Sequence, residues 1–171
     1  SGDVYSQLYA SAFVSENYGT IENCFNLANV TSDWLAAGIA VDNLPGFFRD
    51  GVIRNCYNAG NIEAENETEG IVLNTYGNVL ENCYNIGVAD GLAKGEDQRR
   101  NNYTNIQFAV SDRPEENMST LQMLGEDTEY HTNELFAALN YEENEGVWTI
   151  IPNEDNKWYY PQLKVFEENP L

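Results

Sequence analysis

The chain contains few basic residues. Its 171 residues include 8 Lys and Arg against 28 Asp and Glu, which gives a formal net charge of −20 at pH 7. A charge of this size repels the phosphates of nucleic acids and the headgroups of anionic membranes. We therefore expect no nucleic-acid partner. Beyond that exclusion, an acidic surface favours solubility and carries no information about the fold.

The sequence also lacks the patterns of a membrane span and of common catalytic sites. No run of about 18 apolar residues is present, so we expect no insertion into a membrane. His131 is the only histidine, and neither the zinc-peptidase motif His-Glu-x-x-His nor the nucleophile motif Gly-x-Ser-x-Gly occurs. We expect no catalytic residue and no enzyme activity.

Carboxylate chemistry and metal binding have little support. Among 28 acids, pairs suited to glycoside hydrolysis arise by chance and carry no signal. Two acidic runs offer the several oxygen ligands that calcium needs, namely Glu96, Asp97 and Asn101, and Asn153, Glu154, Asp155 and Asn156. Arg99, Arg100 and Lys157 lie beside these runs and disfavour a cation. We expect no metal and no cofactor, with calcium as the one alternative.

The three cysteines reveal an internal repeat. An odd number cannot all pair within one chain, and their spacing matches no usual zinc motif. They lie 32 and 27 residues apart in nearly identical surroundings. The repeated segments are Gly19-Thr-Ile-Glu-Asn-Cys-Phe-Asn26, Gly51-Val-Ile-Arg-Asn-Cys-Tyr-Asn58 and Gly77-Asn-Val-Leu-Glu-Asn-Cys-Tyr-Asn85. Each follows an apolar run, and the loop before Cys56 is the longest.

Short β-branched and aromatic segments between Gly and Asn are typical of strands and turns, and residues 10–90 show no helical period. One such unit cannot bury its apolar face alone, whereas stacked units can. The sequence therefore predicts a mainly β fold, with a parallel β-helix or solenoid of about three to four turns over residues 1–110. Residues 111–171 are predicted to form a small α+β C-terminal cap with one short helix and strands, because an open sheet end invites aggregation.

Stacking predicts columns of equivalent residues along the axis. Strict alternation would place Ile21 and Cys24 on opposite faces although both are apolar, so we expect a corner at the intervening Asn, which tolerates left-handed backbone. Cysteines would then fill the interior as small apolar residues, and asparagines would bond to one another along the axis. The predicted structural ladder comprises Asn23, Cys24, Asn26, Asn55, Cys56, Asn58, Asn82, Cys83 and Asn85.

An aromatic column accompanies this ladder and consists of Phe25, Tyr57 and Tyr84. If the column faces inward, it contributes to packing. If it faces outward, it is a candidate ligand-binding stripe on which sugar rings could stack. The sequence leaves both alternatives open.

The pattern Gly-x-Ile-x-Asn-Cys-Tyr-Asn-x-Gly-x-Val, preceded by Gly-Ile-Val, resembles the GLUG-type repeat over roughly residues 10–90. That repeat occurs in bacterial surface and secreted proteins, including the non-catalytic part of some IgA-specific metallopeptidases. The resemblance implies a secreted or cell-surface location and a non-catalytic structural or adhesion module. Its partner would be a host or matrix protein or a glycan, and we expect the isolated segment to be a monomer. The alternative is a carbohydrate-binding accessory module that uses the aromatic column.

The remaining sequence predicts a few short elements. We expect a strand over Thr104–Val110, a helical turn over Ser119–Leu124, a helix over Asn133–Asn140 with Thr132 or Asn133 as its N-cap, and strands over Val147–Ile151 and Trp158–Leu163.

Overall fold

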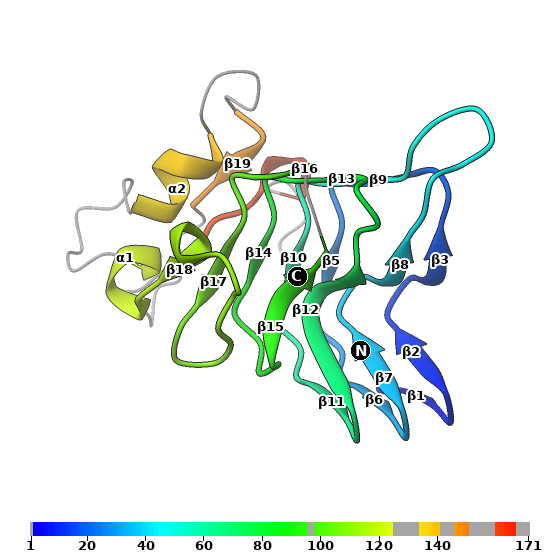
Figure 1. The fold of residues 1–171 in the computed structure, drawn as a ribbon. Coiled ribbons are helices and arrows are strands. Elements are labelled where there is room, and N and C mark those ends of the chain that lie inside the picture. Colours follow the sequence, from blue (N-terminus) through cyan, green and yellow to red (C-terminus); the bar gives the residue numbers. More distant parts are fainter. Residues whose placement is uncertain (1, 96–97, 125–133, 141–145, 151–159, 167–171) are drawn as a thin grey trace. The chain divides into compact units, whose positions relative to one another are not determined.

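The computed structural model describes residues 2–95, 98–124, 134–140, 146–150 and 160–166 (Figure 1). The chain divides into two compact units, Ser1–Asn117 and Met118–Leu171. The first unit consists of short strands in parallel sheets, which confirms the prediction of a mainly β fold with parallel pairing. Among the described residues, no helix is both long and apolar enough to cross a membrane.

The first unit contains four sheets, which together we call the stack. One sheet is formed by β1 (Val4–Ser6), β6 (Val30–Ser32) and β11 (Ile62–Ala64). The largest sheet is formed by β2 (Tyr9–Ser11), β3 (Val14–Asn17), β7 (Leu35–Ala37), β8 (Ala40–Asn43), β12 (Glu67–Asn74) and β15 (Gly91–Lys94). A third is formed by β4 (Thr20–Glu22), β9 (Val52–Arg54), β13 (Val79–Glu81) and β16 (Gln98–Arg100). The fourth is formed by β5 (Phe25–Asn26), β10 (Tyr57–Asn58), β14 (Tyr84–Asn85), β17 (Tyr103–Asn105) and β18 (Asn117–Met118).

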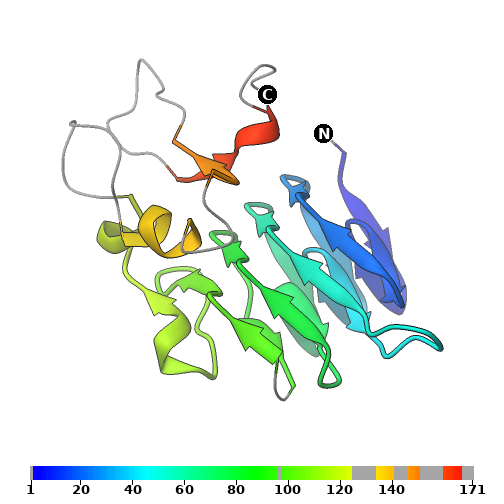
Figure 2. The same ribbon diagram turned by 90° about the horizontal axis from the view of Figure 1, so that it is seen from above.

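The chain visits these sheets in the same order in each repeat, and equivalent strands of successive repeats lie side by side (Figures 1 and 2). The pairing is in register: Ile21 lies opposite Ile53, and Ile53 opposite Leu80. Parallel neighbours lie about 4.8 Å apart, so equivalent side chains contact one another directly. This register explains why each repeat has the same order of chemically different residues.

The core of the stack is built from these columns. Ile53, Leu80, Cys56 and Cys83 are fully buried together with residues of β8, β12 and β15, and Ile21 and Cys24 pack against them. The fourth member of the Ile21 column is Arg99, which pairs with Leu80. A charged side chain thus takes the last described position of an apolar column.

Corners in the stack occur at the asparagine that precedes the cysteine of each motif. Asn23, Asn55 and Asn82 have φ values of 54°, 52° and 57°. Asparagine adopts this left-handed conformation more readily than most residues. The turn redirects the chain between β4 and β5, β9 and β10, and β13 and β14, so that the apolar residue and the cysteine on either side both enter the core.

A charged column fixes the same register on the outside of the third sheet. Glu22 lies opposite Arg54, Arg54 opposite Glu81, and Glu81 opposite Arg100. Arg54 donates two hydrogen bonds to Glu22, and Arg100 donates one to Glu81. Alternating signs attract across each strand pair, whereas a shifted register would break them.

The strand predicted over Thr104–Val110 is wrong beyond Asn105. The amide of Phe108 donates to Asn105 O at 2.9 Å, and the amide of Gln107 donates to Asn105 Oδ1 at 3.0 Å. These bonds close a turn, because the asparagine side chain competes with strand pairing for the backbone N–H. The turn is followed by a 3₁₀ helix, η1 (Pro114–Glu116).

The second unit contains two short helices, α1 (Thr120–Leu124) and α2 (Glu134–Leu139), close to the predicted positions. An antiparallel pair follows, formed by β19 (Trp148–Thr149) and β20 (Gln162–Leu163), and then a 3₁₀ helix, η3 (Lys164–Phe166). The predicted N-cap at Thr132 or Asn133 lies outside the described residues, as do Trp158 and His131.

Candidate functional site

The predicted asparagine ladder forms a directed chain of buried hydrogen bonds. Asn26 Nδ2 donates to Asn58 Oδ1 at 2.8 Å, and Asn58 Nδ2 donates to Asn85 Oδ1 at 2.8 Å. Each amide also donates to the carbonyl two residues further along its own chain, which is Gly60 O for Asn58. All three side chains are buried. Both amide hydrogens are therefore used, and the ladder holds the stack in register.

The corner asparagines form a second, shorter column. Asn82 Nδ2 donates to Asn55 Oδ1 at 2.6 Å, and both residues are buried. Asn23 shares their backbone conformation but is exposed, because it belongs to the first repeat of the stack. Asn55 and Asn82 therefore contribute to packing inside the stack, and their buried side chains are not accessible to a ligand.

The cysteine column lies on the inside of the stack, with Cys24 partly exposed at its end. Cys56 and Cys83 are buried, Cys24 is half-buried, and all three are free thiols. Burial raises the pKa of Cys56 well above its usual value, and the hydrogen bond with Cys56 raises that of Cys24. Neutral thiols are poor nucleophiles and poor metal ligands. Within the part of the chain that the structure describes, no cluster of three metal-ligating side chains is found.

The aromatic column of Phe25, Tyr57 and Tyr84 is a continuous stack of rings. The centroids of Phe25 and Tyr57 are 5.2 Å apart, and those of Tyr57 and Tyr84 are 5.0 Å apart with nearly parallel planes. Phe25 is half-buried, but Tyr57 and Tyr84 expose only 6% and 0% of their surface. Burial raises the pKa of Tyr57 to about 12. As the chain is folded here, no sugar reaches the faces of Tyr57 and Tyr84, which favours packing over recognition.

Arg99, which follows the acidic residues of the first run in the sequence, belongs to an internal ion-pair cluster. Arg99 is buried and donates to Ala93 O and to Asp112 Oδ1, and its Nε lies 3.7 Å from Glu116 Oε1. Its charge is therefore matched by carboxylates of the same unit. Glu96 and Asp97 lie outside the described residues, as does the second run from Asn153 to Asn156, so the structure describes neither calcium site.

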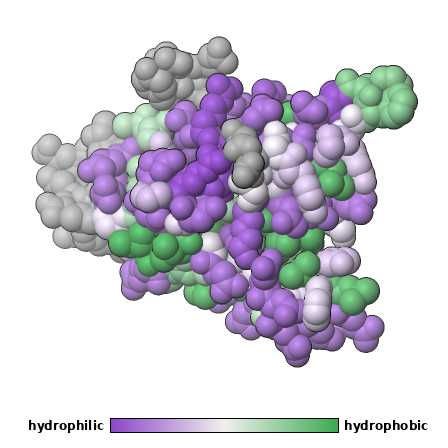
Figure 3. All heavy atoms as spheres, in the orientation of Figure 1, coloured by the Kyte–Doolittle hydropathy of each residue, from purple (hydrophilic) through white to green (hydrophobic). Residues whose placement is uncertain are grey.

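A different surface is exposed at the corner between the second and third sheets. In the second repeat the chain makes a protruding loop between β8 and β9 (Figure 1). Phe47 and Phe48 are the middle residues of this loop. These side chains are 96% and 94% exposed, and their rings meet edge to face at 5.0 Å. Apolar atoms are seen at the outer end of this loop (Figure 3). Two adjacent exposed phenylalanines make this loop a candidate interaction surface.

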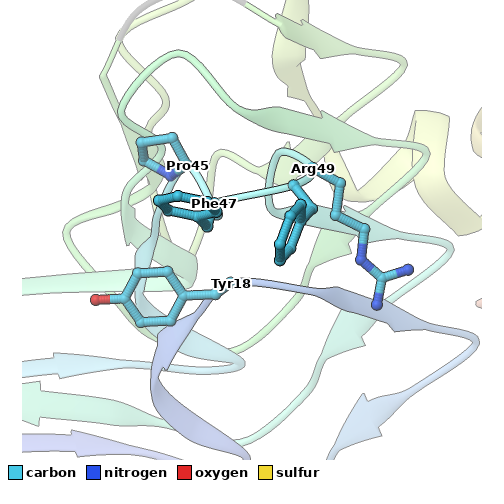
Figure 4. Close-up of a pocket in the computed structure, with 6 residues that line it drawn as sticks. Tyr18, Pro45, Phe47 and Arg49 are labelled. Atoms are coloured by element: carbon cyan, nitrogen blue, oxygen red, sulfur yellow. The ribbon is translucent and has the colours of Figure 1, made fainter.

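The equivalent turns of the other two repeats also carry exposed aromatic residues. Tyr18 lies between β3 and β4, and Tyr76 lies between β12 and β13. We call Tyr18, Phe47, Phe48 and Tyr76 the aromatic corner. Tyr18 and the loop line a hollow of about 360 Å³, with the Tyr18 and Phe47 rings on one side and the Arg49 guanidinium on the other (Figure 4).

Backbone and asparagine hydrogen bonds hold the loop in place. The amide of Gly46 donates to Arg49 O at 2.9 Å, and that of Gly51 donates to Leu44 O at 3.2 Å. Beneath the loop, buried Asn43 donates from its side chain to Gly51 O at 3.2 Å and accepts from Asn17 Nδ2 at 2.8 Å. The two phenylalanines therefore sit in the middle of a closed turn on a fixed base.

Phe47 and Phe48 are not among the site residues predicted from the sequence. The available signal was the longer spacing before Cys56, combined with two adjacent phenylalanines in a Pro-Gly-Phe-Phe-Arg-Asp-Gly segment that has no counterpart in the other repeats. A loop inserted into one copy of a repeat maps to the surface and is frequently part of the binding face.

Comparisons with known proteins do not assign the chain to a group. No family model matches the sequence, and no curated protein or solved structure shows significant similarity to it.

Proposed function

We propose that the first unit is a β-solenoid of about three to four turns that serves as a non-catalytic structural and adhesion module of a bacterial secreted or cell-wall protein. Its partner is a host or matrix protein or a glycan. The successive turns would be β1–β5, β6–β10, β11–β14 and β15–β17. Parallel pairing of equivalent strands in all four sheets supports this interpretation, as does the resemblance to the GLUG-type repeat. The register of β12 and β15 shifts between Glu69 and Asn74.

The aromatic corner is the main structural support for a binding role. Three successive repeats place exposed aromatic side chains at equivalent turns, on a base held by buried asparagines. A rigid repeat array that presents a row of side chains along one edge is typical of binding scaffolds. Burying these rings against a partner would remove apolar surface from water without reorganising the stack.

The alternative of a carbohydrate-binding module loses its original support, because Tyr57 and Tyr84 are buried. A glycan ligand would have to bind elsewhere, on the aromatic corner or on other exposed aromatic side chains such as Tyr5, Tyr9 and Trp34. We therefore retain glycans among the ligands to be screened but do not propose the Phe25, Tyr57 and Tyr84 column as their site.

The test is a binding screen with the isolated chain. Extracellular-matrix proteins and a glycan array are probed with and without calcium, using wild type, Phe47→Ser/Phe48→Ser and the control Ile106→Ser, which removes a half-exposed apolar side chain on another turn. We expect saturable binding that falls at least about tenfold in the double variant and not in the control. Turnover of any probe, such as cleavage of a polyuronate, would contradict a non-catalytic module.

A further inference from the structure

The loop that carries Phe47 and Phe48 at the aromatic corner is already ordered before a partner binds. Phe47 and Phe48 follow Gly46, whose amide bonds to Arg49 O, and Gly51 closes the loop with Leu44 O. Asn43, which bonds to Asn17 and to Gly51 O, is fully buried at the base of the loop. A partner therefore meets two adjacent rings whose backbone is already ordered, so that little conformational entropy is lost when they are covered.

The surroundings of the pair are acidic. Glu16 lies opposite Asp42 on neighbouring strands that lead into the corner. The hydroxyl of Tyr18 donates to Glu16 at 2.9 Å, and Asp42, paired with Glu16 in register, lies on the same face of the sheet just before the loop. Asp50 is exposed in the loop itself.

Basic side chains do little to neutralise this region. Arg49 is the one basic residue of the loop. Arg54, Arg99, Arg100 and Lys94 each form ion pairs with acidic residues elsewhere in the stack. With a formal net charge of −20 over the whole chain, the field around the corner is negative.

We infer that the aromatic corner docks into an apolar pocket on a partner protein whose rim is rich in Lys and Arg. The two phenylalanines would fill the pocket, and Glu16, Asp42 and Asp50 would meet the basic rim. Central apolar anchors with charged surroundings of complementary sign are the usual arrangement of a protein–protein hot spot. This inference rests on the proposed adhesion function and adds the chemical class of the partner.

The charge of the corner distinguishes this partner from the other classes. An anionic membrane or nucleic acid would be repelled. A neutral glycan or a zwitterionic bilayer would be indifferent to Glu16 and Asp42, and its binding would depend little on salt. The acidic side chains and the rings therefore make separate, measurable contributions.

The experiment uses a displayed library of random peptides, selected on the full chain and then depleted on Phe47→Ser/Phe48→Ser. Affinities of the selected peptides are measured by fluorescence anisotropy for wild type, the phenylalanine variant and Glu16→Gln/Asp42→Asn. Controls are Ile106→Ser and Glu63→Gln/Glu65→Gln, which removes two exposed acids from β11 and the residue after it. Phosphatidylcholine vesicles are tested in parallel.

We expect the selected peptides to combine apolar residues with Lys or Arg. Their affinity should fall at least about tenfold in the phenylalanine variant and about three- to tenfold in Glu16→Gln/Asp42→Asn. It should also weaken as NaCl rises from about 0.05 M to about 0.5 M, while both controls bind like wild type.

Different results would contradict the inference about the partner and the proposed adhesion function. Peptides without basic residues, salt-independent binding, or preferential binding to the vesicles would overturn the inference about the partner and leave an adhesion module. Affinities that do not change in the phenylalanine variant would overturn the aromatic corner as the site. If wild type selects no peptide and also binds no probe of the matrix and glycan screen, both the inference and the adhesion function fail.

Discussion

Asn58 donates a 2.8 Å hydrogen bond from its side-chain amide to Asn85 Oδ1, and neither side chain reaches solvent. The two residues are equivalent positions of successive repeats, paired in register on β10 and β14. A shift of one residue in either strand would break the bond and leave buried polar atoms without partners. The asparagine that recurs in the motif therefore specifies how the repeats stack.

Replacing Asn58 should weaken the stack strongly. Asn58→Ala leaves Asn26 Nδ2, Asn85 Oδ1 and Gly60 O without their present partner, so we expect the free energy of unfolding to fall by about 3 kcal/mol. Chemical denaturation monitored by circular dichroism measures this change. Exposed Asn66→Ala should change it by less than about 0.5 kcal/mol. Equal effects of the two substitutions would refute a structural ladder.

A methyl group at Gly60 should disturb the close approach of neighbouring repeats. A Cβ at this position would lie 1.9 Å from Ala28 O, so that the backbone would have to shift. We expect Gly60→Ala to lower the free energy of unfolding by about 1–3 kcal/mol or more. Gly2→Ala, which meets no atom within 4 Å, is the matched control. A Gly60→Ala variant with wild-type thermal stability would show that the repeats are not packed this closely.

Glu69 should make stability depend on pH. Its carboxyl group is 2% exposed, and burial raises its pKa from 4.5 to about 8, with Lys94 partly opposing the shift. The folded chain thus keeps a proton that the unfolded chain releases near pH 4.5. Its contribution to stability is full below that pH, declines as pH rises and is lost above about pH 8.

The variant Glu69→Gln keeps the shape of the side chain and removes its charge. We expect a higher melting temperature than wild type at pH 9 and no difference near pH 4.5 or below, measured by thermal denaturation over a pH series. The exposed control Glu63→Gln should follow wild type throughout. Identical curves for Glu69→Gln and wild type at pH 9 would mean that Glu69 is not buried.

Residues 119–171 are expected to protect the end of the repeats. Removing them should lower the melting temperature or cause aggregation, because an uncovered sheet end exposes unpaired backbone groups. Size-exclusion chromatography and thermal denaturation of the shortened chain measure both effects. Removing only residues 167–171 is the control. A monomeric 1–118 fragment with an unchanged melting temperature would count against the cap.

Periodic features of the chain were predictable, whereas the exposed site was not. The recurring Asn-Cys-aromatic-Asn motif predicts stacked columns because like side chains in neighbouring parallel strands can pack against and hydrogen-bond to one another. Periodicity could not tell whether Tyr57 faces solvent, since both faces of β10 are buried. Phe47 and Phe48 were not predictable from the repeat because they occur in one repeat alone. The strand prediction past Asn105 is wrong because a hydrogen bond to the side chain of Asn105 closes a turn there.

We propose that the aromatic corner, and not the stacked column of Phe25, Tyr57 and Tyr84, is the binding surface. Hydrogen-exchange mass spectrometry of the chain, free and bound to the tightest ligand from the matrix and glycan screen, distinguishes the two surfaces. We predict that protection appears in the turns around Tyr18 and Tyr76 and in the loop of residues 44–51. Protection confined to β5, β10 and β14 would show instead that the ligand binds at the column of Phe25, Tyr57 and Tyr84.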